Sequence, residues 1–359
     1  QAVGSENRTS VGPLIRQGAW IALIFGGMLF TLVRFAEPIF VLFQVPDDVI
    51  VIAMAYLSAA SWGLPAVVLY VTLRYACEGL GQTVLPMLIA GSTLPVNAAL
   101  NYVLIYGVFG LPELGGEGCG WATAITMWFE LSVMLLVIKR PWLLDTGLLD
   151  RFDWPRFDPM SSIFRVGVPI GLTLFLEMTV FALISLLVGS IGVTAIGANT
   201  IAGNLNWFVF VIPMSLGSAA SIRVGFYVGA KDYQAAAQVA RLTIFVSATY
   251  AFLAFAVLIL GRDDLPKIYS SDAEVVALTA DLLLIVACYQ LFDCPQATLI
   301  GILRGYKDTK IPMFISWSGY WLLALPVGLI LGWGLLGPNW GVLGFWVGLG
   351  LGVAWIAGF

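Results

Sequence analysis

The sequence predicts an all-α polytopic membrane protein, because apolar residues dominate it and recur in runs long enough to cross a bilayer. Hydrophobic residues make up 60% of the 359 positions and charged residues 11%, with a mean hydropathy of +0.95. An ordinary soluble domain carries about 45–50% apolar and about 25% charged residues. Thirteen Trp, twelve Tyr and 39 Gly suit a bilayer, where aromatic rings gather at the interfaces and glycines let helices pack closely.

A bilayer-crossing helix needs about 20 mainly apolar residues, and we expect ten such spans. Their predicted limits are residues 14–43, 49–75, 85–106, 119–138, 164–188, 195–222, 239–260, 275–303, 311–331 and 341–359. Two of the breaks carry helix-starting side chains. Asp47 and Asp48 follow a proline, and the run from Ser271 to Glu274 has the form of a capping box. Such carboxylates in short loops are interpreted as solvated helix ends rather than catalytic pairs.

Basic residues predict the orientation, because loops retained in the cytoplasm are enriched in Lys and Arg. Of the 17 basic residues, 14 fall in one set of alternate loops, and the opposite set holds only Arg262 and Lys267. We therefore expect the Gln1 side to face the cytoplasm. The same holds for residues 141–163, whose mixture of aromatic and basic side chains suits the headgroup region of a membrane.

An internal repeat predicts how the spans are grouped. Four residues of the run EGLGQTVLPM recur 226 positions later in the run RGYKDTKIPM, namely Gly79, Thr83, Pro86 and Met87 as Gly305, Thr309, Pro312 and Met313. Gly118 and Gly344 keep the same offset, and Val3-Gly4 matches Val228-Gly229 at 225. Both copies follow a span on the same side of the membrane, so the repeat is parallel.

The repeat predicts two helical lobes. We expect an N-terminal lobe over residues 1–140 with four spans, an inter-lobe linker over 141–163 and a C-terminal lobe over 164–359 with six spans. Two spans precede Val228-Gly229 and none precedes Val3-Gly4. The first lobe is therefore expected to be truncated by two helices and the last span to end short, relative to an intact form with 6+6 spans.

Three carboxylates stand deep in the predicted spans: Glu177, Asp293 and Glu130. A charge at the bilayer centre costs about 2.5–3.5 kcal/mol on insertion scales, so an intramembrane acid is a functional candidate. The alternative is a structural role, in which each carboxyl accepts hydrogen bonds from neighbouring helices. For Glu130 the two interpretations carry equal weight, whereas function is favoured for Glu177 and Asp293.

Asp293 has the richest polar surroundings. Tyr289, Gln290 and Gln296 lie on or near its helical face. Pro295 frees the carbonyl four residues before it, which adds backbone oxygen beside the carboxylate. Oxygen groups of this kind are ligands for a hard cation or partners for a proton.

Other polar groups in the spans are interpreted as structural. Arg34 and Glu37 share a helical face and are expected to form an ion pair, and the amides in or near spans are expected to join helices. Histidine is absent, and the four cysteines show no C-x-x-C spacing. This excludes most zinc sites and His-dependent catalysis, and we expect buried, unpaired cysteines: Cys77, Cys119, Cys288 and Cys294.

Four motifs resemble NorM-type bacterial members of the multidrug and toxic compound extrusion (MATE) family. They are RGYKDT at 304–309, EGLGQT at 78–83, PELGGEGCGWATAI at 112–125 and IPMSLGSAASIRVG at 212–225. The motif loops include Glu78, Gly79, Arg304, Gly305 and Asp308. The resemblance implies two six-helix lobes around a central cavity, in a transporter rather than an enzyme. It also implies export of organic cations and drugs in exchange for sodium ions or protons across the bacterial cytoplasmic membrane.

The resemblance also implies the site residues. Glu177 and Asp293 would form the coupling-cation site, with Tyr289 beside them, and the two carboxylates would hold the metal if sodium is the coupling ion. The family's other acidic site lies in the first helix of its N-terminal lobe, which is absent from this chain. We expect no cofactor besides the coupling ion, membrane lipid and small molecules as partners, no nucleic acid, and a monomer.

Two other functions compete with this one. A flippase for lipid-linked oligosaccharide or lipid II, from the same superfamily, would need cationic side chains in its cavity to hold a diphosphate, and only Arg34 lies within a span. A membrane-embedded transferase or hydrolase is disfavoured, because the sequence has no His and no intramembrane D-D-x-x-D pair.

Overall fold

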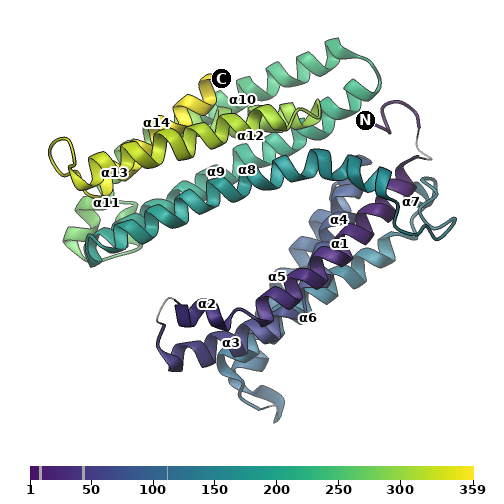
Figure 1. Cartoon of the computed structure of the whole chain (residues 1–359), viewed down its shortest axis with the longest axis horizontal. Helices are drawn as coiled ribbons and strands as arrows, with labels where there is room; N and C mark the ends of the chain where they lie inside the picture. The colour runs from purple at the N-terminus through teal and green to yellow at the C-terminus, as the bar shows by residue number, and fades with distance from the viewer. Residues whose placement is uncertain (8–9, 43–44, 111) are drawn as a thin grey trace. The chain divides into compact units, whose positions relative to one another are not determined.

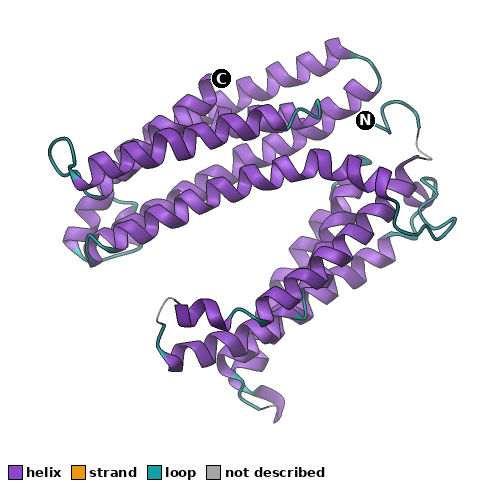
Figure 2. Ribbon diagram, viewed as in Figure 1, coloured by secondary structure: helices purple, strands orange, loops and turns teal. Residues whose placement is uncertain are grey.

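The computed structural model describes residues 1–7, 10–42, 45–110 and 112–359, and all regular elements in these ranges are helical (Figure 2). The chain divides into two compact units. The N-terminal unit holds Ala2 and Glu6–Ile163, and the C-terminal unit holds Gln1, Val3–Ser5 and Phe164–Phe359. The all-α fold expected from composition is confirmed.

The N-terminal unit is a helical bundle in which α1 packs on α4, and α6 packs on α3, α4 and α5 (Figure 1). Its elements are α1 (Val11–Arg34), α2 (Glu37–Leu42), α3 (Asp47–Ser61), α4 (Leu64–Gly79), α5 (Val84–Tyr106), η2 (Val108–Gly110), α6 (Gly115–Val137) and α7 (Pro141–Leu144).

The first predicted span proves shorter than expected. Helix α1 ends at Arg34 and a separate helix, α2, begins at Glu37. Pro38 is the physical reason, because proline is tolerated in the first turn of a helix but breaks a helix interior. The predicted end at Phe43 lies outside the described residues.

The second predicted span, 49–75, is a broken helix. Helices α3 and α4 meet at an angle of 47°. Gly63 and Pro65 lie at the break: proline removes a backbone donor and clashes with the preceding turn. A Cβ placed on Gly63 would come within 2.9 Å of the Cα of Ala124 on α6. The break therefore also allows α6 to approach closely.

The C-terminal unit is built around α11, which packs on α9, α10 and α14. Its elements are α8 (Phe157–Gly189), α9 (Val193–Gly229), α10 (Tyr233–Leu260), η3 (Pro266–Ile268), α11 (Ala273–Gly305), α12 (Lys310–Trp317), η4 (Ser318–Ala324), α13 (Leu325–Trp333) and α14 (Val342–Gly358). Helices α12, η4 and α13 form one continuous span, and η4 is a π-helical turn within it. A π-helical turn is frequently found at a functional site.

In the described part of the chain, eight helices are long and apolar enough to cross a membrane, or nine when α3 and α4 count as one span. Helix α14 is apolar but shorter. Large apolar side chains are exposed along the spans, for example Phe245, Phe252 and Leu253 on α10. In water such exposure would be costly, whereas in a bilayer these side chains meet lipid.

Two local predictions are shifted along the chain. Helix α8 begins at Phe157, not at residue 164, because Asp158 and Pro159 suit a first helical turn. The N-cap of α11 is Asp272 rather than Ser271, since the Asp272 carboxylate accepts hydrogen bonds from the backbone N–H groups of Glu274 and Val275.

The repeat is visible in the backbone of each unit. Gly118 on α6 and Gly344 on α14 make equivalent close approaches: a Cβ on Gly118 would lie 2.5 Å from the Leu104 carbonyl oxygen, and one on Gly344 2.5 Å from the Gly332 nitrogen. Gly81 and the residue 226 positions later, Lys307, both have positive φ. The loop geometry therefore recurs together with the loop sequence.

Residues 145–156 pack against α1 inside the N-terminal unit. Arg16 forms an ion pair with Asp153, and Trp20 donates its indole N–H to the Asp153 carbonyl. Gln17 donates to the carbonyl of Trp154, whose ring stacks on that of Trp20. The hydrogen bond from Arg16 holds the pKa of Asp153 below its ordinary value.

Candidate functional site

Glu177 on α8 and Asp293 and Tyr289 on α11 line a single cavity of about 180 Å³ in the C-terminal unit. Their exposed fractions are 9%, 1% and 2%, so all three are buried. The full lining is Glu177, Met178, Phe181, Gly203, Asn206, Trp207, Phe210, Tyr289 and Asp293. The structure thus brings together the three residues singled out from the sequence, although 116 positions separate the two acids.

Glu177 is oriented by the π-helical turn η4. The hydroxyl of Tyr320 donates to Oε1 of Glu177 at 3.2 Å, and the indole N–H of Trp321 donates to the Leu176 carbonyl. Both bonds tie η4 to the same turn of α8. Sequence reasoning missed Tyr320, although a tyrosine in the middle of a span is itself a signal, because its hydroxyl needs a partner there.

Asp293 presents a buried oxygen without a partner. Its Oδ1 accepts no hydrogen bond from the described residues, which is unusual for a buried polar atom. Tyr289 precedes Asp293 by one turn of α11, and its ring meets Trp346 edge to face at 6.2 Å. A carboxyl in this position is suited to binding an ion or a proton.

A polar network behind the cavity joins α11 to α9. Gln290 donates to Oδ1 of Asn206 at 2.8 Å, and the thiol of Cys294 donates to Oε1 of Gln290. Ser247 on α10 donates to the Cys294 carbonyl. These groups satisfy one another, so the network positions α11 rather than supplying free ligands.

The oxygen-bearing side chains on the cavity lining are the two carboxyls, Tyr289 and Asn206. Oxygen groups of this kind are preferred by hard cations. Within the described ranges, no group of three or more His, Cys, Asp or Glu side chains is arranged to hold a metal ion. A cation at this cavity would therefore combine the two carboxylates with neutral oxygens.

Glu130 lies apart from this cavity, on α6 of the N-terminal unit, where it is half-buried. The structure does not bring it together with the other two acids.

The motif-loop residues have structural environments. Glu78 pairs with Arg74 in the last turns of α4, which ends at Gly79. Asp308 accepts from the backbone of Ile311 at the start of α12. Arg304 and Gly305 form the last turn of α11, and a Cβ on Gly305 would lie 2.9 Å from the Ser221 carbonyl.

The ion pair predicted between Arg34 and Glu37 is absent from the described structure. The Arg34 guanidinium lies over the rings of Phe30 and Trp62, at 4.9 and 5.1 Å from their centroids, and donates to Ser61 Oγ. The prediction was wrong because α1 ends at Arg34, so the helical face that it assumed does not continue to Glu37.

The cysteine prediction is partly right. All four cysteines, each within the described residues, are free. Cys77 and Cys294 are buried, Cys119 is half-buried and Cys288 is exposed.

These features define a class, the multi-pass α-helical membrane proteins, with an acid-lined cavity inside one helical unit. A model of the MatE family matches residues 1–103 and 169–330, which is more than half of the chain. The chain belongs to this family and is similar to its NorM-type members.

Three curated relatives show the similarity. The probable multidrug resistance protein NorM of Idiomarina loihiensis is 36% identical over 357 residues, which cover 98% of this chain and 77% of the relative. The multidrug resistance protein PmpM of Pseudomonas aeruginosa is 36% identical over 360 residues, covering 98% and 75%. The multidrug resistance protein MdtK of Yersinia pseudotuberculosis is 36% identical over 356 residues, covering 98% and 78%.

Solved structures support the fold. The eukaryotic MATE transporter AtDTX14 has a TM-score of 0.86 at 21% identity, and the match covers 99% of this chain and 78% of that one. The Vibrio cholerae MATE transporter VcmN in its bent form has a TM-score of 0.81 at 18% identity, covering 99% and 79%.

Proposed function

We propose that the protein is a multidrug efflux transporter that exports organic cations in exchange for sodium ions or protons, with Glu177 and Asp293 as the coupling site. One observation carries the proposal: two carboxyls from different helices line one buried cavity, and one of them has an oxygen without a partner. The names of the relatives, which are multidrug resistance proteins, support the substrate class.

The site chemistry explains why a cation is needed. Two carboxylates in a medium of low dielectric constant cannot both stay ionised without a nearby cation or a bound proton. Tyr320 holds one oxygen of Glu177 in place, and Tyr289 lies beside Asp293. A sodium ion would be bound by both carboxylates, whereas a proton would be shared between them.

Exchange follows from a conformational equilibrium. A ligand shifts that equilibrium by its difference in affinity for the two states. The coupling ion and the drug favour different states, so binding of the ion releases the drug, and the ion gradient drives export. The coupling is reciprocal in binding free energy.

We place the protein in the bacterial cytoplasmic membrane as a monomer, with the Gln1 side cytoplasmic, because 14 of the 17 basic residues fall in loops on that side. A flippase for a diphosphate-linked lipid is disfavoured, since the cavity is lined by acids. Arg34, the basic residue within a predicted span, already contacts two aromatic rings and Ser61.

Ethidium efflux from membrane vesicles that contain the protein tests the proposal. An imposed sodium gradient and an imposed pH gradient are compared at equal membrane potential, with protein-free vesicles as the control. We expect one gradient to drive export and the other to have little effect. Export under neither gradient would rule out the antiporter.

A further inference from the structure

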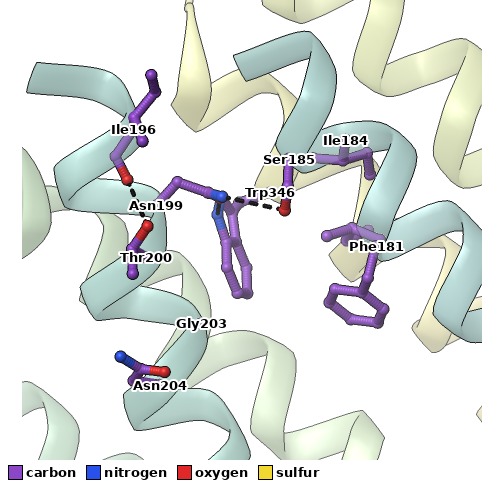
Figure 3. Close-up of a pocket in the computed structure, with 10 residues that line it drawn as sticks. Phe181, Ile184, Ser185, Ile196, Asn199, Thr200, Gly203, Asn204 and Trp346 are labelled. Atoms are coloured by element: carbon purple, nitrogen blue, oxygen red, sulfur yellow. Dashed lines mark hydrogen bonds between the residues drawn. The ribbon is translucent and has the colours of Figure 1, made fainter. Parts of the chain in front are cut away.

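A second cavity of about 260 Å³ lies between α8, α9 and α14 in the C-terminal unit. Its lining is Phe181, Ile184, Ser185, Ile196, Asn199, Thr200, Gly203, Asn204, Trp346 and Leu349. Figure 3 shows the side chains from α8 and those from α9 on opposite walls. Four of them end in a hydroxyl or an amide although they stand in membrane spans, which points to a wet surface rather than lipid contact.

Part of this polar surface is held rigidly. The Asn199 amide donates to Ser185 Oγ at 3.4 Å and accepts from the indole N–H of Trp346 at 3.0 Å, so it connects all three helices. Thr200 donates to the backbone carbonyl of Ile196 (Figure 3). Asn204 is exposed, and its amide makes no hydrogen bond to the described residues. Oxygen atoms of Asn204 and Thr200 are therefore available to a ligand.

The second cavity adjoins the acid-lined one, because Phe181 and Gly203 line both. Along α8, the residues Glu177, Phe181 and Ser185 are spaced four apart and share one helical face. At a rise of about 1.5 Å per residue, Ser185 lies about 12 Å along the helix from Glu177. Phe181 is the residue between them, and Gly203 occupies the equivalent place on α9.

Gly203 leaves space at this junction. A Cβ built on it would meet no atom within 4 Å, so the wall opposite Phe181 has no side chain. The half-buried ring of Phe181 supplies an apolar constriction, and constrictions of this kind control the passage of hydrated ions by excluding water. Neutral oxygens before the constriction can replace part of the hydration shell without trapping the ion.

We propose that the second cavity is the vestibule through which a hydrated monovalent cation reaches Glu177 and Asp293, with Phe181 and Gly203 as its threshold. The proposal rests on the proposed coupling function and names its access route. With the Gln1 side cytoplasmic, α8 runs outward, and Ser185 lies nearer its outer end than Glu177 does. The vestibule then opens toward the outer side of the membrane.

The test separates the route from the site by comparing rates with equilibria. Gly203→Leu fills the threshold, Gly203→Ala fills it less, and Gly171→Leu is the matched control. Gly171 on α8 also has open space at its Cβ position and lines neither cavity. Cation binding is followed by stopped-flow tryptophan fluorescence after a sodium jump or a pH jump. Trp207, which lines the acid cavity, is replaced by Phe to assign the signal.

A threshold affects arrival and departure equally. We expect Gly203→Leu to slow binding and release about tenfold with an unchanged Kd, Gly203→Ala to slow them less, and the control to match the unmodified protein. Phe181→Ala should accelerate both steps. Unchanged rates in Gly203→Leu, or a weaker Kd without slower binding, would overturn the vestibule.

A second measurement covers the case in which Gly203→Leu fails to fold. Asn204→Cys, modified by a positively charged thiol reagent, should slow sodium or proton binding, and prior addition of the cation should slow the modification. Cys288, which is exposed on α11 and lines neither cavity, is the internal control. Equal binding rates before and after modification would contradict the proposal. If the unmodified protein shows no cation-dependent signal, the coupling function fails and the vestibule with it.

Discussion

Residues 47–79 of the N-terminal unit and residues 273–305 of the C-terminal unit are the same stretch of the repeat, offset by 226 positions at both ends, yet they form different structures. The later copy is one continuous helix, α11. The earlier copy is broken into α3 and α4, bent by 47°. Both copies end at the motif glycine, so the loops match while the membrane interiors differ.

The site residues follow this difference. Asp293 and Tyr289 on α11 correspond to Val67 and Gly63 in the earlier copy. Gly63 allows the close approach of α6 at the break, where α11 carries the tyrosine of the acid cavity. The comparison shows that the repeat preserves loop geometry, while the chemistry of the interior belongs to one copy.

A second irregularity also occurs at matching positions with different causes. Pro95 lies inside α5, and the residue 226 positions later is Trp321, within the π-helical turn η4. The π-helical turn places Tyr320 on Glu177. A backbone irregularity at this level is therefore common to both copies, and only the later one carries a side chain into an acidic site.

The largest expected effect comes from removing the acids of the later copy. Asp293→Asn should reduce gradient-driven ethidium export to the level of protein-free vesicles, because a neutral amide cannot balance a cation or carry the proton. Glu177→Gln should weaken or abolish export. Glu130→Gln, in the N-terminal unit, is the matched control and should have a smaller effect. Normal export by a folded Asp293→Asn protein would contradict the assignment of the chemistry to this copy.

The next effect tests the π-helical turn. Tyr320→Phe removes the hydroxyl that orients Glu177, and a hydrogen bond to a charged group contributes about 1.5–3 kcal/mol, so cation affinity should fall about tenfold or more. Affinity is measured by equilibrium titration of tryptophan fluorescence with sodium or protons. Pro95→Ala alters the matching irregularity in the other copy and should leave the affinity unchanged. Equal losses in the two variants would show a general packing effect.

A smaller effect tests the equivalence of the loops. Gly118→Ala and Gly344→Ala each force a Cβ against backbone atoms at 2.5 Å, and overpacking of this kind costs about 1–3 kcal/mol. We expect similar losses of thermal stability in detergent for the two variants. Gly350→Ala on α14, where the added Cβ meets no atom within 4 Å, should cause none. Strongly unequal losses would show that the two contacts are not equivalent.

The smallest effect concerns residues 145–156, which pack on α1. Arg16 lowers the pKa of Asp153 in the folded protein, so this contact contributes its stability above the unfolded value of about 3.9. That contribution is lost as pH falls through the lower folded pKa. Hydrogen exchange of residues 145–156 should therefore accelerate at acid pH, and Asp153→Asn should remove the pH dependence. A pH-independent exchange rate in the unmodified protein would contradict the role of this ion pair.

The sequence by itself determined the fold class, the approximate spans, the repeat and the three intramembrane acids. These properties depend on local composition and on periodic spacing, because a bilayer selects apolar runs of fixed length whatever the rest of the chain does. The helix breaks at Pro38 and near Pro65 could also have been predicted from the residues, since proline acts on its own turn.

Only the tertiary structure decided which side chains meet. Tyr320 reaches Glu177 across 143 positions, and Phe181 and Gly203 lie together where two cavities join. Such contacts depend on the rotation of each helix about its axis and on its register against its neighbours. A uniformly apolar helix reveals neither, because its hydrophobic pattern has no preferred face. The partners of Arg34 changed for the same reason, once α1 ended at that residue and turned its guanidinium toward Phe30 and Trp62.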